Sequence, residues 1–153
     1  KGQNKYNNVR IGVNSRLDTL QAVVLIEKLK ILEEELILRN EVAKLYDKKI
    51  DDKFIKPQIS LEDKRLAWAQ YTLLVPAQLN RELVIDAMSI RGISTGIFYP
   101  KPIHQQPAYL EFSGVACLNA EKFSLQCLSL PMGPYVTDEE IDFISDTLNN
   151  EVS

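Results

Sequence analysis

The stretch YPKPIHQQPAY, residues 99–109, carries several side chains that could hold a polar ligand. Hydroxyl, imidazole and amide groups come from Tyr99, His104, Gln106 and Tyr109. Pro102 and Pro107 flank the histidine and restrict the backbone. A stiff loop with these groups suits recognition of a hydroxyl-rich ligand through hydrogen bonds. The alternative is a loop that only folds over a sheet, with His104 as an exposed turn residue.

A second candidate site lies near the start of the chain, in the segment RIGVNSRLD, residues 10–18. Asn14 and Arg16 are next to a predicted helix start, where free backbone N–H groups and the helix dipole favour an anion such as phosphate. The alternative is an asparagine that bonds to nearby backbone and an arginine exposed on the surface. The residue types alone favour this second interpretation.

Signatures of catalysis are missing from the sequence. It contains no GxGxxG, P-loop, nucleophile elbow or HExxH pattern. A structural zinc site needs four ligands. Cys117 and Cys127 form no CxxC pair, and the chain has one histidine to add to them. We therefore expect no metal site and interpret both cysteines as buried, reduced thiols. The residues alone predict binding of a polar ligand and no catalysis.

Length and composition indicate one globular domain over residues 1–153. The chain is 45% hydrophobic and 25% charged, with a formal net charge of −3. The lack of a dense Lys/Arg block argues against nucleic acid as a partner. No apolar run reaches the ~18–20 residues that cross a bilayer, and no signal peptide is recognisable. We expect a cytoplasmic protein with no membrane partner.

The candidate residues need elements to position them, and the longest predicted element is a helix from Ser15 to about Ile50. This stretch contains no Pro or Gly. One helical face carries the apolar residues Leu25, Leu29, Leu32, Leu36, Ala43, Tyr46 and Ile50. Ser15 and Asp18 fit a capping box, which predicts a helix start at Ser15. At 1.5 Å per residue the helix would be roughly 50 Å long, so we expect it to reach along a second domain or a partner.

Shorter elements are predicted for the rest of the chain. Strands are expected at 66–76 and 94–100, and helices at 80–92, 119–131 and 137–150. The predicted fold class is therefore α+β, with a long N-terminal helix followed by a small, mostly antiparallel sheet covered by helices.

Capping residues support the three shorter helices. Asn80 and Asn119 are predicted N-caps, and Gly92 is predicted to end the first of these helices. Thr137 and Glu140 form a complete capping box for the last helix.

Four segments, in order, resemble the motifs of one enzyme family. They are IGVNSRLDTLQAVVLIEKL (11–29), AWAQYTLLV (67–75), GISTGIFYPKPIHQQPAY (92–109) and LSLPMGPYVTDEEID (128–142). Together they resemble the C-terminal part of the DegT/DnrJ/EryC1/StrS sugar aminotransferases, which use pyridoxal 5′-phosphate (PLP). The resemblance spans residues 2–149 and implies the small domain of a fold-type I enzyme.

The resemblance implies roles for individual residues. Asn14 matches the asparagine of the family's G-x-N-x-R-L-D motif, which reaches across a homodimer interface to the cofactor phosphate of the other subunit, and Arg16 would lie near that partner's active site. In relatives a loop of the pattern H-Y-P-x-P-x-H-x-Q-P-A-Y helps to cover the nucleotide-sugar substrate. The matching substrate-binding residues are Tyr99, His104, Gln106 and Tyr109. Phe98 replaces the histidine of many relatives, so the hydrogen bond of that position is lost and the substrate subtype stays open.

The family's cofactor lysine is not found in the chain. That lysine, the aspartate at the pyridine nitrogen and the aromatic residue on the cofactor ring belong to an N-terminal large domain, upstream of Lys1. Transamination needs the lysine. We therefore expect an inactive C-terminal part of a larger enzyme, with no catalytic residue and no bound cofactor of its own. Its expected partners are the large domain and the second subunit of a homodimer.

For the whole enzyme the resemblance implies transfer of an amino group from L-glutamate to a UDP-linked keto-sugar, for the amino sugars of bacterial surface polysaccharides. Two alternatives stay open. PLP-dependent sugar 3-dehydratases share this small domain and have histidine in place of the lysine. A non-catalytic ligand-binding or interaction domain would need no cofactor.

Overall fold

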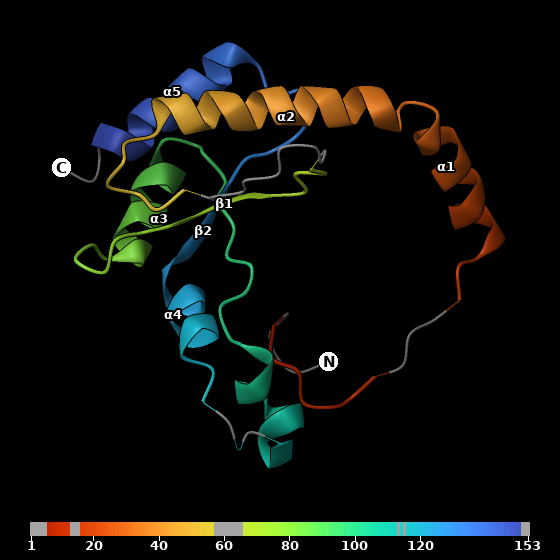
Figure 1. Ribbon diagram of the computed structural model, residues 1–153, viewed down its shortest axis with the longest axis vertical. Coiled ribbons are helices and arrows are strands. Elements are labelled where there is room, and N and C mark those ends of the chain that lie inside the picture. Colours follow the sequence, from red (N-terminus) through yellow and green to blue (C-terminus); the bar gives the residue numbers. More distant parts are fainter. Residues whose placement is uncertain (1–5, 13–15, 57–65, 113, 115, 151–153) are drawn as a thin grey trace.

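The computed structural model describes residues 6–12, 16–56, 66–112, 114 and 116–150 (Figure 1). Its elements, in order, are α1 (Thr19–Leu29), α2 (Leu32–Lys49), β1 (Tyr71–Leu74), α3 (Arg81–Ile90), the 3₁₀ helices η1 (Ile103–Gln105) and η2 (Pro107–Phe112), α4 (Leu118–Gln126), β2 (Cys127–Leu130) and α5 (Asp138–Asn150). The α+β class and the antiparallel sheet are confirmed.

The sheet is built around β2. Strands β1 and β2 are antiparallel, with Tyr71 opposite Leu130. Single bridges extend the sheet on both sides, where Ile55 pairs with Leu74 of β1 and Gly96 pairs with Ser129 of β2. A side chain at position 96 would require the Phe98 ring to move, because an added Cβ would lie 2.6 Å from that ring.

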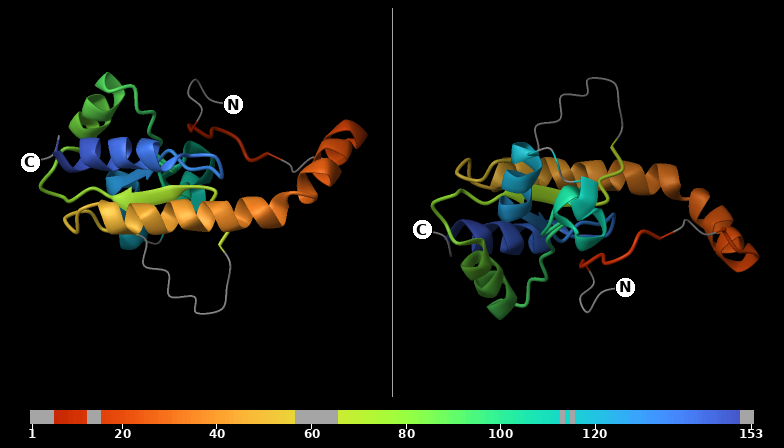
Figure 2. Two further views of the ribbon diagram at one scale, coloured as in Figure 1. Left: turned by 90° about the horizontal axis from the view of Figure 1, so that it is seen from above. Right: turned by 90° about the horizontal axis from the view of Figure 1, so that it is seen from below.

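Helices α2 and α5 lie side by side over the sheet, and α3 packs beside α5 (Figures 1 and 2). The largest fully buried side chains come from each of these elements. They include Tyr46, Tyr71, Leu73, Met88, Leu128, Ile141 and Leu148. Because these helices and both strands all contribute buried side chains, the core depends on contacts between segments far apart in the sequence.

Two tyrosines make polar contacts within this core. The Tyr46 hydroxyl donates to the Pro131 carbonyl over 2.8 Å, and the Tyr71 hydroxyl donates to the Asp47 carboxylate over 2.6 Å. Their rings lie 4.9 Å apart. Burial, together with the charge of Glu140, raises the pKa of Tyr46. Burial, followed by the hydrogen bond to Asp47, raises the pKa of Tyr71, so both phenols stay protonated at neutral pH.

The prediction of one long helix is wrong, because two helices, α1 and α2, meet at a bend. No Pro or Gly lies at the bend. Instead, Glu35 of α2 accepts a hydrogen bond from the Tyr135 hydroxyl at 3.1 Å and forms an ion pair with Lys28 of α1 at 3.5 Å. Within Glu27–Lys30, the lysine amine bonds to the glutamate carboxylate at 2.6 and 2.7 Å. Of these contacts, the bond from Tyr135 joins residues 100 positions apart, which the helical periodicity does not encode.

The start of this helical region also differs from the prediction. Helix α1 begins at Thr19, with Asp18 as the N-cap whose carboxylate accepts from Gln21 N over 2.8 Å. The predicted cap Ser15 lies outside the described residues. Of the predicted apolar face, Ala43, Tyr46 and Ile50 are buried, while Leu25, Leu29 and Leu32 are exposed.

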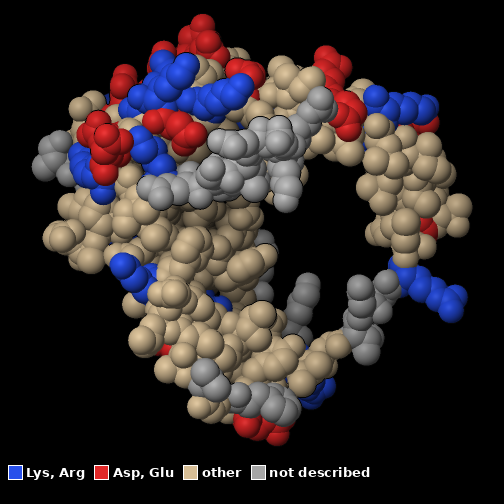
Figure 3. All heavy atoms as spheres, viewed as in Figure 1, with Lys and Arg blue, Asp and Glu red and all other residues tan. Residues whose placement is uncertain are grey.

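Helix α1 is the least covered element of the described chain. None of its residues is buried, and Leu20 is 81% exposed. Figure 3 shows open space between α1 and the body of the molecule, and a largely uncharged surface on α1. Isolated helices of this length are marginal in water, and an apolar exposed face is typical of a surface that another chain or domain covers.

Two shorter predicted elements are also corrected. The segment 94–100 forms only the Gly96 bridge, because Pro100 and Pro102 cannot donate hydrogen bonds to a continuing strand. The helix predicted over 119–131 ends at Gln126, and the next four residues form β2, all of them buried. A strand buried on both faces lacks the apolar-polar alternation that would reveal it.

The capping predictions have mixed outcomes. Asn80 caps α3 through bonds from Glu82 N and Leu83 N, and Gly92 follows its end with a φ of 77°. Thr137 and Glu140 exchange the two bonds of a capping box before α5. For α4, the predicted cap Asn119 is wrong. Cys117 occupies the cap position and its side chain does not cap the helix, whereas its backbone N–H donates to the Glu121 carboxylate over 3.2 Å.

Replacing Tyr46 by Phe tests the link between α2 and the turn before α5. We expect Tyr46→Phe to lower the free energy of unfolding by about 1 kcal/mol, because the Pro131 carbonyl loses its donor. Urea denaturation at neutral pH measures the change. Tyr135→Phe is the control, since Tyr135 is exposed and its hydroxyl bonds to the Glu35 carboxylate, so its loss should cost less. Equal losses in the two variants would contradict the assignment.

Candidate functional site

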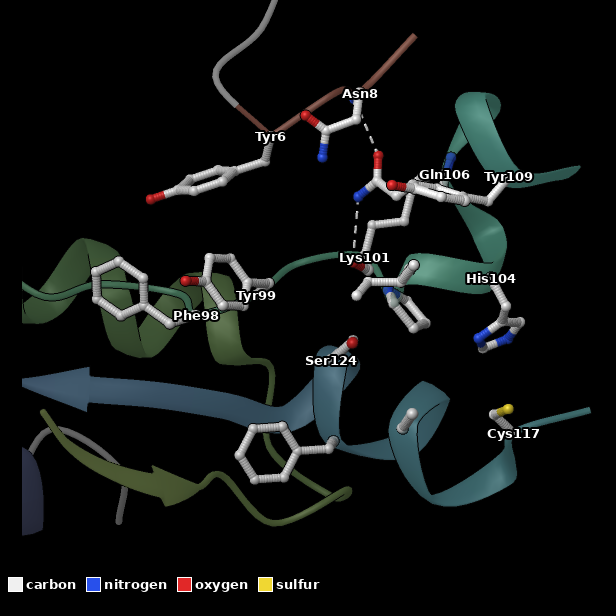
Figure 4. A pocket seen from close by; sticks show the side chains of 14 residues that line it. Tyr6, Asn8, Phe98, Tyr99, Lys101, His104, Gln106, Tyr109, Cys117 and Ser124 are labelled. Carbon is white, nitrogen blue, oxygen red and sulfur yellow. Dashed lines mark hydrogen bonds between the residues drawn. The ribbon is translucent and has the colours of Figure 1, made fainter. Parts of the chain in front are cut away.

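The candidate site is an open cavity of about 910 Å³ between the loop after Gly96 and helix α4 (Figure 4). Its lining is mostly apolar and aromatic, and Lys101 adds a positive charge. The aromatic side chains are Tyr6, Phe98, Tyr99, Tyr109 and Phe123. Polar groups come from Asn8, His104, Gln106 and Ser124. An apolar concave surface with a few polar groups is suited to a small-molecule ligand.

Short local hydrogen bonds shape the loop that lines this cavity. Gln105 N donates to Pro102 O over 3.1 Å, and Gln106 N donates to Ile103 O over 2.9 Å, which closes η1. Tyr109 N then donates to Gln106 O over 2.9 Å within η2. The prolines precede these turns and fix φ near the value that a 3₁₀ helix needs. The predicted stiff loop is thus formed by two short 3₁₀ helices.

His104 links this loop to α4. Its Nε2 lies 3.0 Å from Glu121 Oε1, and the same oxygen accepts from Cys117 N. The imidazole is four-fifths buried, with a side-chain exposure of 19%. His104 is therefore not an exposed turn residue. Its Nδ1 remains for a ligand, while Nε2 holds the two walls of the cavity together.

Gln106 is the most buried polar residue of the loop, with 4% exposure. Its Oε1 accepts from Asn8 N over 3.1 Å, and its Nε2 donates to Lys101 O over 3.3 Å. Ala108 N donates to Asn8 O over 3.0 Å. The amino-terminal segment is thereby attached to the loop, as the dashed lines of Figure 4 show in part.

The structure brings four of the predicted substrate-binding residues to this cavity. They are Tyr99, His104, Gln106 and Tyr109. Arg16 is exposed before α1 and does not line the cavity. Asn14 lies outside the described residues. Phe98, the predicted departure from the family pattern, lines the cavity and adds an apolar ring.

The helix start lies further along the chain than the anion-binding prediction assumes. The predicted helix start at Ser15 would have placed Asn14 and Arg16 at free N–H groups. The observed N-cap is Asp18, and its own carboxylate already occupies the first turn of α1.

Several lining residues were missed by sequence reasoning. Tyr6 and Asn8 come from the amino-terminal segment, and Phe123 and Ser124 come from α4. No local signal marks them, because Asn8 and its partner Gln106 are 98 positions apart. Lys101 was inside the predicted loop but was not singled out.

The two cysteines lie in different environments. Cys127 is buried at the start of β2, whereas Cys117 is exposed at the rim of the cavity, so the prediction that both are buried is wrong. Burial raises the pKa of the Cys127 thiol, against the opposing effect of the Arg81 guanidinium. Within the described residues, no group of three or more His, Cys, Asp and Glu side chains could hold a metal ion. None of the helices there is long and apolar enough to cross a membrane.

Comparison with known proteins places this chain in an enzyme family. A model of the DegT/DnrJ/EryC1/StrS aminotransferase family matches residues 1–149. The chain belongs to this family. A relative, UDP-2-acetamido-2-deoxy-3-oxo-D-glucuronate aminotransferase of Pseudomonas aeruginosa, is 38% identical over 146 residues, which cover 95% of this chain and 40% of that protein.

Solved structures of the DegT/DnrJ/EryC1/StrS family share the fold. A family aminotransferase from Brucella abortus matches with a TM-score of 0.79 and 39% identity, over 96% of this chain and 39% of that one. A Bacillus subtilis structure with bound cofactor PMP matches with a TM-score of 0.74 and 26% identity, over 92% of this chain and 33% of that one. The chain thus spans about 40% or less of the length of these family members.

Thiol reactivity tests the placement of the cysteines. We expect a disulfide reagent at mildly alkaline pH to label Cys117 rapidly in the folded protein and Cys127 only after unfolding, because burial blocks access to the Cys127 thiol and raises its pKa. The rate of thiol release measures this difference. Cys117→Ser is the matched variant and should leave the folded protein almost unreactive. Rapid labelling of that variant would show that Cys127 is accessible.

Proposed function

We propose that this chain is the C-terminal domain of a PLP-dependent aminotransferase that moves an amino group from L-glutamate to a UDP-linked keto-sugar. The observation that carries the proposal is the cavity, which gathers Tyr99, His104, Gln106 and Tyr109 in a member of an aminotransferase family. The name of the Pseudomonas aeruginosa relative supports a UDP-linked 3-oxo sugar as the substrate class. We further propose that the product enters bacterial surface polysaccharides and that the enzyme acts in the cytoplasm.

In this proposal the cavity binds and orients the nucleotide-sugar. Tyr99 and Tyr109 offer hydroxyl groups and ring faces, and His104 offers Nδ1 while Glu121 holds its other nitrogen. Lys101 brings a positive charge that suits a diphosphate. The apolar lining excludes water around the bound sugar and strengthens these polar contacts. Arg16 would reach the active site of a second subunit and not this cavity.

The cofactor would be held by residues beyond the described cavity. Asn14 would bind its phosphate through the side-chain amide in the partner subunit of a homodimer. Bound PLP supplies an electron sink for movement of the amino group. The residues of this chain bind and orient substrate, and we propose that the lysine that carries PLP belongs to a large domain upstream of residue 1.

The exposed face of α1 supports a larger assembly. Its apolar residues include Leu20, Val23, Val24, Ile26 and Leu29, and all of them are exposed. Relatives extend well beyond the matched region, since the chain spans 40% of the Pseudomonas aeruginosa protein. We propose that the large domain and the second subunit cover α1.

Amino transfer by the full-length protein tests this function. We expect nitrogen-labelled L-glutamate and a UDP-linked 3-keto-sugar to yield a labelled amino-sugar nucleotide, because the proposed reaction moves that nitrogen to the sugar. Mass spectrometry of the nucleotide product measures the transfer. The dTDP-linked sugar is the control for the nucleotide and should react more slowly.

Two outcomes would contradict this proposal. A dehydrated sugar without the label would identify a 3-dehydratase. No conversion of any keto-sugar, in protein that binds the nucleotide-sugar, would favour a non-catalytic binding domain.

A further inference from the structure

Both polar groups of the Gln106 side chain are used inside the protein. Oε1 accepts from Asn8 N, and Nε2 donates to Lys101 O. The Ala108 N–H donates to the carbonyl of Asn8, so both main-chain groups of Asn8 are bound to the loop. We call these contacts the clasp, formed by Asn8, Gln106 and Ala108.

The clasp places Tyr6 beside the cavity. The rings of Tyr6 and Tyr99 lie 5.8 Å apart at an interplanar angle of 73°, and both line the cavity. Figure 4 shows Tyr6 on the side of the amino-terminal segment, facing the loop that carries Phe98 and Tyr99. The residues that follow Asn8 give the segment little anchorage, since Val9 and Ile11 are exposed. Removal of the clasp should therefore loosen the segment that carries the Tyr6 ring.

We propose that Gln106 is a positioning residue that acts through Tyr6, and that Tyr6 is an aromatic wall for the base of a nucleotide. This inference rests on the proposed function, because it assumes that the cavity takes a nucleotide-sugar. Aromatic rings bind bases by stacking, which needs a ring held in place before the ligand arrives. The low exposure of Gln106 leaves little of its surface for a ligand, whereas Tyr6 is half-buried and lies on the cavity wall.

This role differs from direct contact between Gln106 and substrate. If Gln106 touched the ligand without acting through Tyr6, its loss would weaken binding further even in protein that already lacks the Tyr6 ring. If Gln106 acts by holding Tyr6, its loss has no further effect once the ring is absent. The effect of Gln106→Leu in the Tyr6→Leu background therefore separates the two roles.

A double-mutant cycle in the full-length protein tests the inference, with UDP as the probe in titration calorimetry. We expect Gln106→Leu and Tyr6→Leu each to weaken UDP binding about tenfold, the effect of roughly one net hydrogen bond or one stacked base. The double variant should bind as weakly as Tyr6→Leu alone. Gln105→Leu is the matched control, one position earlier in η1, and should bind UDP as the wild type does.

Hydrogen exchange of the Asn8 amide monitors the clasp itself. It should be at least tenfold faster in Gln106→Leu and unchanged in Gln105→Leu. Should Gln106→Leu fold poorly, Asn8→Pro removes the same hydrogen bond from the other side and should also weaken UDP binding about tenfold.

Three results would overturn the inference. Additive effects would show that Gln106 contacts the ligand directly. Faster exchange with unchanged UDP affinity would reduce the clasp to a structural role. Failure of the wild-type protein to bind UDP would remove the proposed function and this inference with it, and it differs from the other two results because no variant is involved.

Discussion

The pairing of β2 on both of its edges is the constraint on which the rest of the structure depends. All four residues of Cys127–Leu130 are buried, and a buried strand must satisfy its backbone groups within the protein. β1 does so on one edge, and Gly96 does so on the other over 2.7 and 2.9 Å. The same strand continues α4 at one end and leads to Pro131, the acceptor for Tyr46, at the other.

This constraint links the core to the cavity. The bridge at Gly96 fixes the origin of the loop that carries Tyr99 and His104, and β2 fixes the end of α4, which forms the opposite wall. The bond between His104 and Glu121 then joins the two walls directly. The small sheet thus forms the base of a site to which three parts of the chain contribute. The proposed amino transfer also depends on residues outside this site.

Local signals in the sequence predicted the elements that local contacts determine. The caps at Asn80 and at Thr137 with Glu140 bond within three residues, so the starts of α3 and α5 were predicted correctly. The bend between α1 and α2 coincides with contacts of Glu35, including one to Tyr135, which lies 100 positions away. The sequence pattern predicts helix for the residues of β2, because complete burial removes the alternation of apolar and polar residues that marks a strand.

The residues of the candidate site likewise fall into those that a local motif predicts and those that long-range contacts bring in. The loop residues Tyr99, His104, Gln106 and Tyr109 were predicted because they lie within one short motif, and the structure places all four at the cavity. Tyr6 and Asn8 could not be predicted, because long-range hydrogen bonds bring the amino-terminal segment there. Burial of the Gln106 amide likewise depends on main-chain partners at Asn8 and Lys101, which its own sequence motif does not specify.

The most direct test of the account is borohydride reduction of the full-length protein, followed by a search of its peptides for a phosphopyridoxyl group. We expect this group on a lysine upstream of residue 1, because we propose that the cavity of this chain binds substrate and that another domain carries the cofactor. Protein that binds PLP but yields no such adduct would contradict an aminotransferase and favour the dehydratase. Protein that binds no PLP would contradict a PLP enzyme altogether.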